Sequence, residues 1–331
     1  MTNILIIALF LAAAVAAYFV SSRLAMYGDA VSEKTKTTSA FMGIIIGAAI
    51  SLPELTASVT AIAIDSPDIA IGNLLGSNLF NLLALAVLDI VFRRHQVMGQ
   101  TDIGSVLYIY LVIIMTLVVL AGLTLTLPTH LFHIGYNSVV LVLMYFGGVK
   151  WINNKTEKRV KRRNRKNEKY NEYSYNKVII RFALFAFAIM LVGSVLTVTA
   201  DKIASITGLG SSFVGSFLVG ASTSLPDAVS VITALKLRNY SMGVSSLLGS
   251  NAFNIMLLSF TDAIYMKNNL FAHASPSNIV TSVASIIVVL IILYSITRKK
   301  QRSTFLYIMP PSLIVVVYVT ATLIVYQMKG M

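Results

Sequence analysis

Long apolar segments, each bounded by polar or charged residues, follow one another along the whole chain. Ten of them are close to the roughly 20 residues that an α-helix needs to cross a bilayer. We therefore predict spans over residues 3–22, 39–64, 67–91, 103–125, 130–150, 178–199, 211–236, 241–262, 277–297 and 304–326. No basic residue precedes the first segment, which favours a retained span over a cleaved signal peptide. The pattern predicts an all-α membrane protein.

Composition agrees with this pattern and narrows the chemistry. Of the 331 residues, 56% are hydrophobic and 12% are charged, about half the charged fraction of a soluble domain. Cysteine is absent, which excludes disulfides and thiolate metal sites. The four histidines fall in predicted loops or at span ends rather than in a cluster. A metal ion would therefore be held by oxygen ligands.

The formal charge of +13 is concentrated in alternate connections between the spans. The longest of these, residues 151–177, is strongly basic, and such charge beside spans marks the cytoplasmic side. We expect a multi-pass protein of the cell membrane with a cytoplasmic central loop and both termini outside. This distribution argues against a nucleic-acid partner. Besides being a plain solvated loop, residues 155–169 could contact anionic lipid headgroups.

An internal repeat divides the chain into two halves, residues 1–150 and 178–331. Residues 47–85 align without a gap to residues 220–258, with fifteen of thirty-nine positions identical. Each copy starts in the second span of a five-span half, and an odd number of spans inverts the second half. Such inverted repeats are typical of secondary transporters, which bind their cargo at the repeat interface near the bilayer midplane.

Each copy carries an acid, Glu54 or Asp227, near the middle of a span and directly after a proline. An ionised carboxylate is costly in hydrocarbon unless it is paired, hydrated or bound to a cation. Pro53 and Pro226 lack an N–H, so they leave backbone carbonyls free. With nearby hydroxyls, these oxygens approach the six to eight ligands that calcium takes. Acids that only pack helices, and prolines that only kink them, remain the alternatives.

A second duplicated motif, Gly-Ser-Asn at residues 76–78 and 249–251, places small and helix-disfavoured residues in mid-membrane. It can break the helix or let backbones approach closely. One turn later Asn81 and Asn254 present neutral amides, either to an ion or to a neighbouring helix as packing hydrogen bonds.

A further matched pair of acids, Asp89 and Asp262, lies at the ends of the predicted spans. We expect both to be solvated there rather than to belong to the ion site.

The segments GAAISLPELTAS and GASTSLPDAVS, each followed by LLGSNxFN, resemble the two alpha repeats of the calcium/cation antiporter superfamily, which includes sodium/calcium exchangers. The resemblance implies ten transmembrane helices in two inverted five-helix repeats, with broken helices at a midplane ion site. It implies that Glu54 and Asp227 bind calcium and that sodium or protons compete for them. The implied metal ligands are Gly47, Ile50, Ser51, Glu54, Ser77, Asn81, Gly220, Thr223, Ser224, Asp227, Ser250 and Asn254.

Three of these positions differ from the sodium/calcium exchanger pattern. Ile50 stands where the family usually has Thr, and Asp227 is shorter than the common Glu. Asn254 replaces an Asp of many sodium-coupled members, and the pair with Asn81 is more similar to calcium/proton exchangers. We therefore expect calcium/sodium antiport by alternating access, with calcium/proton antiport as the alternative. The ions are cargo, and no cofactor or enzymatic activity is expected.

Two other classes fit the paired acids less well. A passive cation channel would share the chemistry but need no counter-ion. An intramembrane aspartyl protease also needs two acids in separate spans, but neither acid here has the expected Gly-x-Gly-Asp context.

Overall fold

A computed structural model describes residues 3–34, 51–125, 130–131, 134–157, 174–236, 238, 240–267, 270–298 and 303–328. The first half contains α1 (Asn3–Lys34), α3 (Leu52–Ala63), α4 (Pro67–Val91), η1 (Arg93–His95), η2 (Val97–Gln100), α5 (Ile103–Thr124), β1 (His130–Leu131), β2 (Ile134–Gly135) and α6 (Tyr136–Glu157). The second half contains α7 (Tyr175–Thr207), α8 (Ser211–Phe213), η3 (Val214–Val219), α9 (Gly220–Lys236), α10 (Tyr240–Ile264), η4 (Leu270–His273), α11 (Ser277–Thr297) and α12 (Thr304–Gln327). The two short strands pair antiparallel, and the rest of this order is the predicted all-α arrangement.

Eight helices of the described residues are long and apolar enough to cross a membrane. Helix α3 is shorter because the expected span 39–64 is described only from residue 51 onward. Helix α6 falls outside the eight because its last two turns are polar, with Lys150 and Lys155 among them. These two helices occupy the second and fifth positions of the first half, so the order agrees with the predicted spans.

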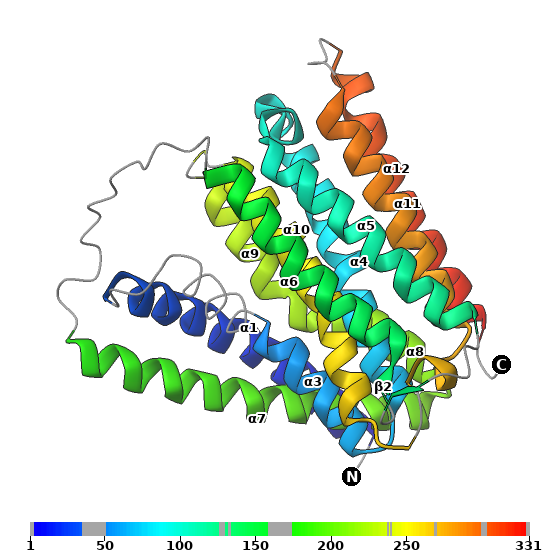
Figure 1. The fold of residues 1–331 in the computed structure, drawn as a ribbon. Coiled ribbons are helices and arrows are strands. Elements are labelled where there is room, and N and C mark those ends of the chain that lie inside the picture. The colour runs from blue at the N-terminus through cyan, green and yellow to red at the C-terminus, as the bar shows by residue number, and fades with distance from the viewer. Residues whose placement is uncertain are drawn as a thin grey trace.

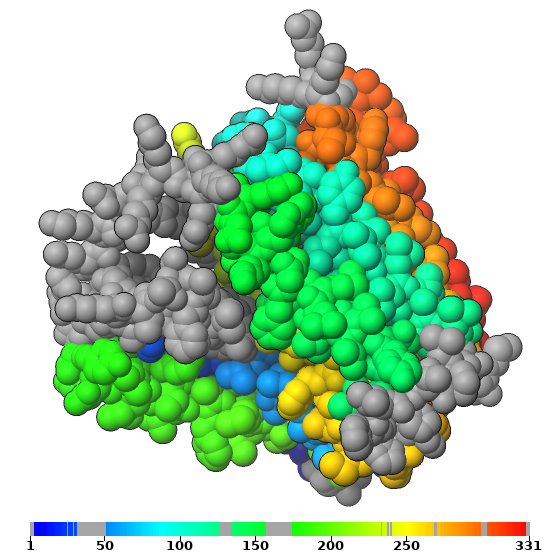
Figure 2. Space-filling view, in the orientation of Figure 1, coloured from blue at the N-terminus to red at the C-terminus, as the bar shows by residue number. Residues whose placement is uncertain are grey.

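The two halves are arranged around two central helices, α4 and α10. In α4, 67% of the span is buried, compared with 17% in α7. Small and amide residues make α4 suitable for an interior position, because they permit close packing and hydrogen bonds between helices. Helices α5, α6 and α7 form much of the visible surface, whereas little of α4 can be seen (Figure 2). Exposed apolar side chains on α7, such as Leu184 and Phe187, suit contact with lipid.

The first helices of the halves, α1 and α7, pack side by side and slant away from the remaining bundle (Figure 1). The ends of α4, α9 and α11 and the starts of α5, α10 and α12 lie at one end of the bundle, and the start of α1 and the end of α12 lie toward the other (Figure 1). The three connections between these helices are basic in the sequence, as predicted for one side of a membrane. The identity of that side remains a prediction.

The turn before each central helix has a residue with a positive φ angle at the same position of the repeat. Asp65 and Arg238, which align in the repeat, both have positive φ angles, of 60° and 57°. Residues other than glycine seldom adopt this left-handed conformation. Its recurrence at equivalent positions supports the repeat independently of sequence identity.

Candidate ion-binding site

The two acid-bearing segments have different local structures. Helix α3 begins at Leu52, with Pro53 in its first turn, where a missing N–H is tolerated. In the second half, α9 continues through Pro226 and is preceded by the π-helix η3. Pro226 cannot donate to the carbonyl of Ser222, which is left for another donor or a cation. Such π-helical turns occur frequently at functional sites.

The Gly-Ser-Asn motifs do not break α4 or α10, and the first of them allows a close backbone approach instead. A Cβ atom on Gly76 would lie 2.0 Å from the carbonyl oxygen of Ser216 in η3. Gly249, its equivalent in α10, is less crowded: the nearest described atom to its Cβ would be 3.8 Å away, in the ring of Tyr108. The helical irregularity at the repeat interface is therefore η3, and only the first motif requires glycine for packing.

Glu54 and Asp227 are both buried, with 1% and 7% of their surfaces exposed. Each receives a hydrogen bond from the opposite repeat. Asn81 Nδ2 donates to Asp227 Oδ2 at 3.1 Å, and Ser224 Oγ donates to Glu54 Oε1 at a long 3.5 Å. Ser250 Oγ also donates to Asp227 Oδ2, at 2.7 Å. The acids thus lie at one interface between the halves, as the inverted repeat predicted.

Hydroxyl and carbonyl oxygens connect the two halves beside these acids. Ser77 Oγ lies 3.2 Å from the carbonyl oxygen of Gly220 and 3.2 Å from Thr223 Oγ1. The side chain of Ser51 is buried at the start of α3. Two of the predicted ligands, Gly47 and Ile50, lie outside the described residues.

Several buried polar atoms of the site have no hydrogen-bond partner among the described residues. They are Glu54 Oε2, Asn81 Oδ1 and both polar atoms of the Asn254 side chain. Buried polar groups are almost always hydrogen-bonded, so a group of unpartnered ones indicates a missing partner. Carboxylate and amide oxygens are the ligands that hard cations prefer. The three oxygens in this set are free to take a cation, whereas the amide nitrogen of Asn254 carries hydrogens and needs an acceptor.

Three asparagines that were not predicted as ligands also lie in this interface. Asn78 Nδ2 donates to the carbonyl oxygen of Asn251, and Asn251 Nδ2 donates to that of Asn78, each at 3.1 Å. Their place in the duplicated motif was a signal for this pair. Asn73, which bonds to both halves, aligns with Ser246, so a search for identical positions passes over it.

The prediction that Asp89 and Asp262 are solvated is wrong, because both are fully buried. Asp89 accepts hydrogen bonds from the Met98 N–H at 3.3 Å and from the Tyr307 hydroxyl. The connection after α4 folds back over the end of the helix and supplies the first of these donors. A helix end judged from the sequence alone gives no sign of such a cover.

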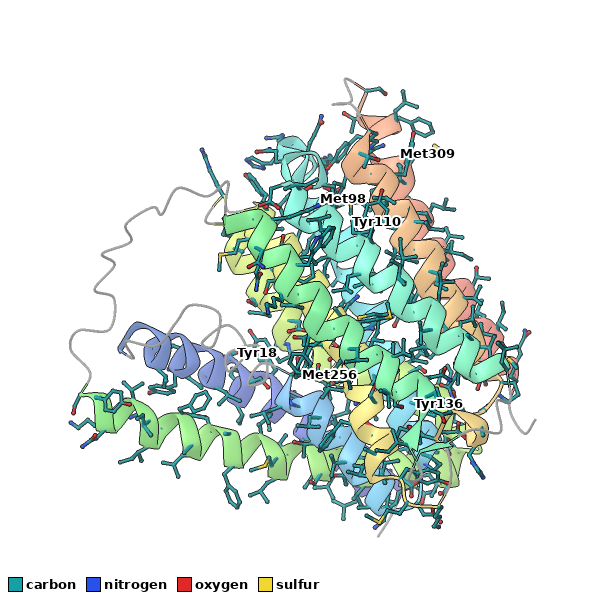
Figure 3. The ribbon with its side chains drawn as sticks, in the orientation of Figure 1. Tyr18, Met98, Tyr110, Tyr136, Met256 and Met309 are labelled. Atoms are coloured by element: carbon teal, nitrogen blue, oxygen red, sulfur yellow. The ribbon has the colours of Figure 1, made fainter. Side chains whose placement is uncertain are left out.

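Asp262 is held in the same way at the end of α10. It accepts the N–H groups of Gly135 and Leu270, each at 2.8 Å. Met98 and Tyr136, which follows Gly135, lie toward opposite ends of the bundle (Figure 3). The two buried acids therefore anchor connections at opposite ends, as equivalent positions of inverted repeats should.

Comparisons with known proteins agree with this architecture. A sequence model of the family described as "Sodium/calcium exchanger protein" matches residues 5–151 and 177–327. An uncharacterized membrane protein of Methanocaldococcus jannaschii is 25% identical over 251 residues, which cover 73% of this chain and 76% of that protein.

Three solved structures have a similar fold. YfkE is 16% identical with a TM-score of 0.64, covering 96% of this chain and 92% of its own. The H+/Ca2+ exchanger CAX is 13% identical with a TM-score of 0.66, covering 97% and 90%. The sodium-calcium exchanger NCX_Mj is 21% identical with a TM-score of 0.57, covering 97% and 98%. From the family match over both halves and this shared fold, we conclude that the chain belongs to the sodium/calcium exchanger family of membrane ion transporters, within the calcium/cation antiporter superfamily.

Proposed function

We propose that this cation/calcium antiporter exchanges calcium for sodium by alternating access, with Glu54 and Asp227 as the principal ligands of one shared site. The observation that carries the proposal is that two buried acids from opposite repeats lie at one interface beside unpartnered oxygens of the described residues. The further ligands are those predicted at Gly47, Ile50, Ser51, Ser77, Asn81, Gly220, Thr223, Ser224, Ser250 and Asn254.

The charge of the site explains why two kinds of cation compete for it. Glu54 and Asp227 together carry two negative charges, which one calcium ion or two monovalent cations neutralise. One calcium ion or two monovalent cations neutralise the same buried acids. The site therefore has its highest free energy when it is empty and both acids are ionised. Rocking of one half against the other then exposes the same site to either side of the membrane in turn.

A proton is the second candidate for the counter-ion. The polar side chains that flank the acids are the neutral amides of Asn81 and Asn254, so the site offers no third carboxylate among these positions. Two protons can neutralise two carboxylates without any further ligand. Sodium, in contrast, needs several coordinating oxygens, which the hydroxyls and carbonyls of the site would supply.

The test is calcium uptake into proteoliposomes under an outward sodium gradient or an outward proton gradient alone. Uptake driven by sodium supports the proposal, and uptake driven only by protons selects the second candidate. Uptake that needs neither gradient would mean a passive channel. Glu54→Gln should abolish uptake by removing one of two charges, whereas Asp65→Asn, at an exposed acid after the same helix, should retain it. Full activity of Glu54→Gln would overturn the site.

A further inference from the structure

Asn73 uses its whole side chain to connect the two halves of the protein. It is fully buried in α4, one turn before Ser77. Its amide nitrogen donates to the backbone carbonyl of Glu54 and to Ser58 Oγ, both at 3.0 Å. Its amide oxygen accepts from Thr223 Oγ1 at 3.2 Å. Two of these bonds stay within the first half, and the third crosses to the second.

The crossing bond lies where the halves approach at backbone distance. A Cβ atom on Gly72, the neighbour of Asn73, would lie 2.9 Å from the carbonyl oxygen of Ser212. A Cβ atom on Gly215 would lie 2.7 Å from the carbonyl oxygen of Ile69. The start of α4 is thus closed against α8 and η3, and Asn73 lies within this contact, which continues to Gly76 and Ser216.

No equivalent connection can form in the second half, because the residue aligned with Asn73 is Ser246. A serine side chain carries one hydroxyl, whereas the asparagine amide offers two N–H groups and an acceptor oxygen. Ser246 is, moreover, exposed in the structure. The described residues of the second half therefore hold no counterpart of the Asn73 contact.

We propose that Asn73 is a positioning residue that links the Glu54 segment to Thr223 and so keeps the site closed at the end where α4 begins. The proposal rests on the proposed function only in treating Glu54 and Thr223 as parts of the ion site. When the halves separate at this end, Asn73 remains bonded to the first half and only its bond to Thr223 breaks. The Asn73 side chain thus moves with Glu54, and its bond to Thr223 holds the two halves together at this end.

Thiol labelling measures this closure directly, because the chain has no cysteine of its own. Ser216, which is fully buried against Gly76, is replaced by Cys and exposed to a membrane-impermeant maleimide. Replacing Asn73 with Ser removes the amide, and the loss of its one bond that crosses between the halves should raise the labelling rate about five- to tenfold. Ser246→Ala in the same background is the matched control and should leave the rate unchanged.

A second variant distinguishes the loss of the bond between Asn73 and Thr223 from general damage to the fold. Thr223→Val removes the crossing bond and keeps those from Asn73 to the first half, so it should also speed labelling. Thr223→Val also removes the contact of Thr223 with Ser77 Oγ, so it is the reference for the double variant. The double variant should label no faster than Thr223→Val alone, because the bond between Asn73 and Thr223 is already lost there. Unchanged labelling in Asn73→Ser, or additive effects in the double variant, would overturn the inference. Labelling needs no transported ion, so failure of calcium uptake would count against the proposed function alone.

Discussion

The duplicated Gly-Ser-Asn motif allows one substitution to be compared at two equivalent positions. In Gly76→Ala the new Cβ would lie 2.0 Å from the carbonyl oxygen of Ser216 and 2.3 Å from its Cα. Ordinary contact is about 3.5 Å, so α4 and η3 would have to separate by about 1.5 Å. Neither neighbour is a side chain that can rotate away. The cost should therefore reach or exceed the upper part of the usual range for overpacking, about 3 kcal/mol.

Gly249→Ala should instead raise the free energy of unfolding. Its Cβ meets no described atom closer than 3.8 Å, so no neighbour has to move. Alanine is favoured over glycine inside a helix by about 0.5–1 kcal/mol. We expect slight stabilisation of this conformation.

Thermal unfolding in detergent, followed by size-exclusion chromatography, and calcium uptake in proteoliposomes measure both variants. At on the order of 2 °C for each kcal/mol in a protein of this size, Gly76→Ala should lower the midpoint by about 6 °C or more. It should also lose uptake, since the altered contact lies beside the ion site. Equal effects of the two alanines, or a more stable Gly76→Ala, would refute the packing argument.

Three further outcomes are expected. Ser250→Ala removes a charge-assisted hydrogen bond to Asp227, and we expect a loss of about 1.5–3 kcal/mol, seen as at least a tenfold weaker apparent calcium affinity in uptake assays. Because Glu54 and Asp227 supply two charges, exchange should be electroneutral, and a valinomycin-imposed potassium potential should not change its rate; a potential-dependent rate would contradict the charge count. Asp262→Ala leaves buried N–H groups without an acceptor and should lower stability by at least about 2 kcal/mol in thermal unfolding, with an unchanged midpoint as the contrary result.

The sequence predicted the spans, the repeat and the placement of Glu54 and Asp227 at one interface. Hydropathy and internal duplication can be read directly from the order of residues. The sequence could not predict which donors reach a side chain across a connection. Asp89 illustrates this limit, since its burial depends on the path of the chain after α4. Asn73 illustrates another, because its role depends on a partner 150 positions away and has no duplicate. Both depend on tertiary packing that no local pattern records.

The reciprocal bonds between Asn78 and Asn251 join equivalent residues and therefore map onto each other when the two repeats are interchanged. In an inverted repeat, exchanging the conformations of the halves converts one access state into the other. The two bonds between Asn78 and Asn251 can therefore be present in both access states, because exchanging the two halves converts each bond into the other.

Contacts between residues that are not equivalent are instead replaced by the corresponding contacts of the other repeat. The bonds from Asn81 to Asp227 and to the side chain of Asn251 correspond to bonds from Asn254 to Glu54 and to Asn78. Within the described part of the chain, Asn254 Nδ2, Glu54 Oε2 and Asn78 Oδ1 are among the buried atoms left without hydrogen-bond partners. These three atoms are the donor and the acceptors of the hydrogen bonds expected in the opposite access state. In that state Asn254 would bond to Glu54 and Asn78, as Asn81 bonds to Asp227 and Asn251 here.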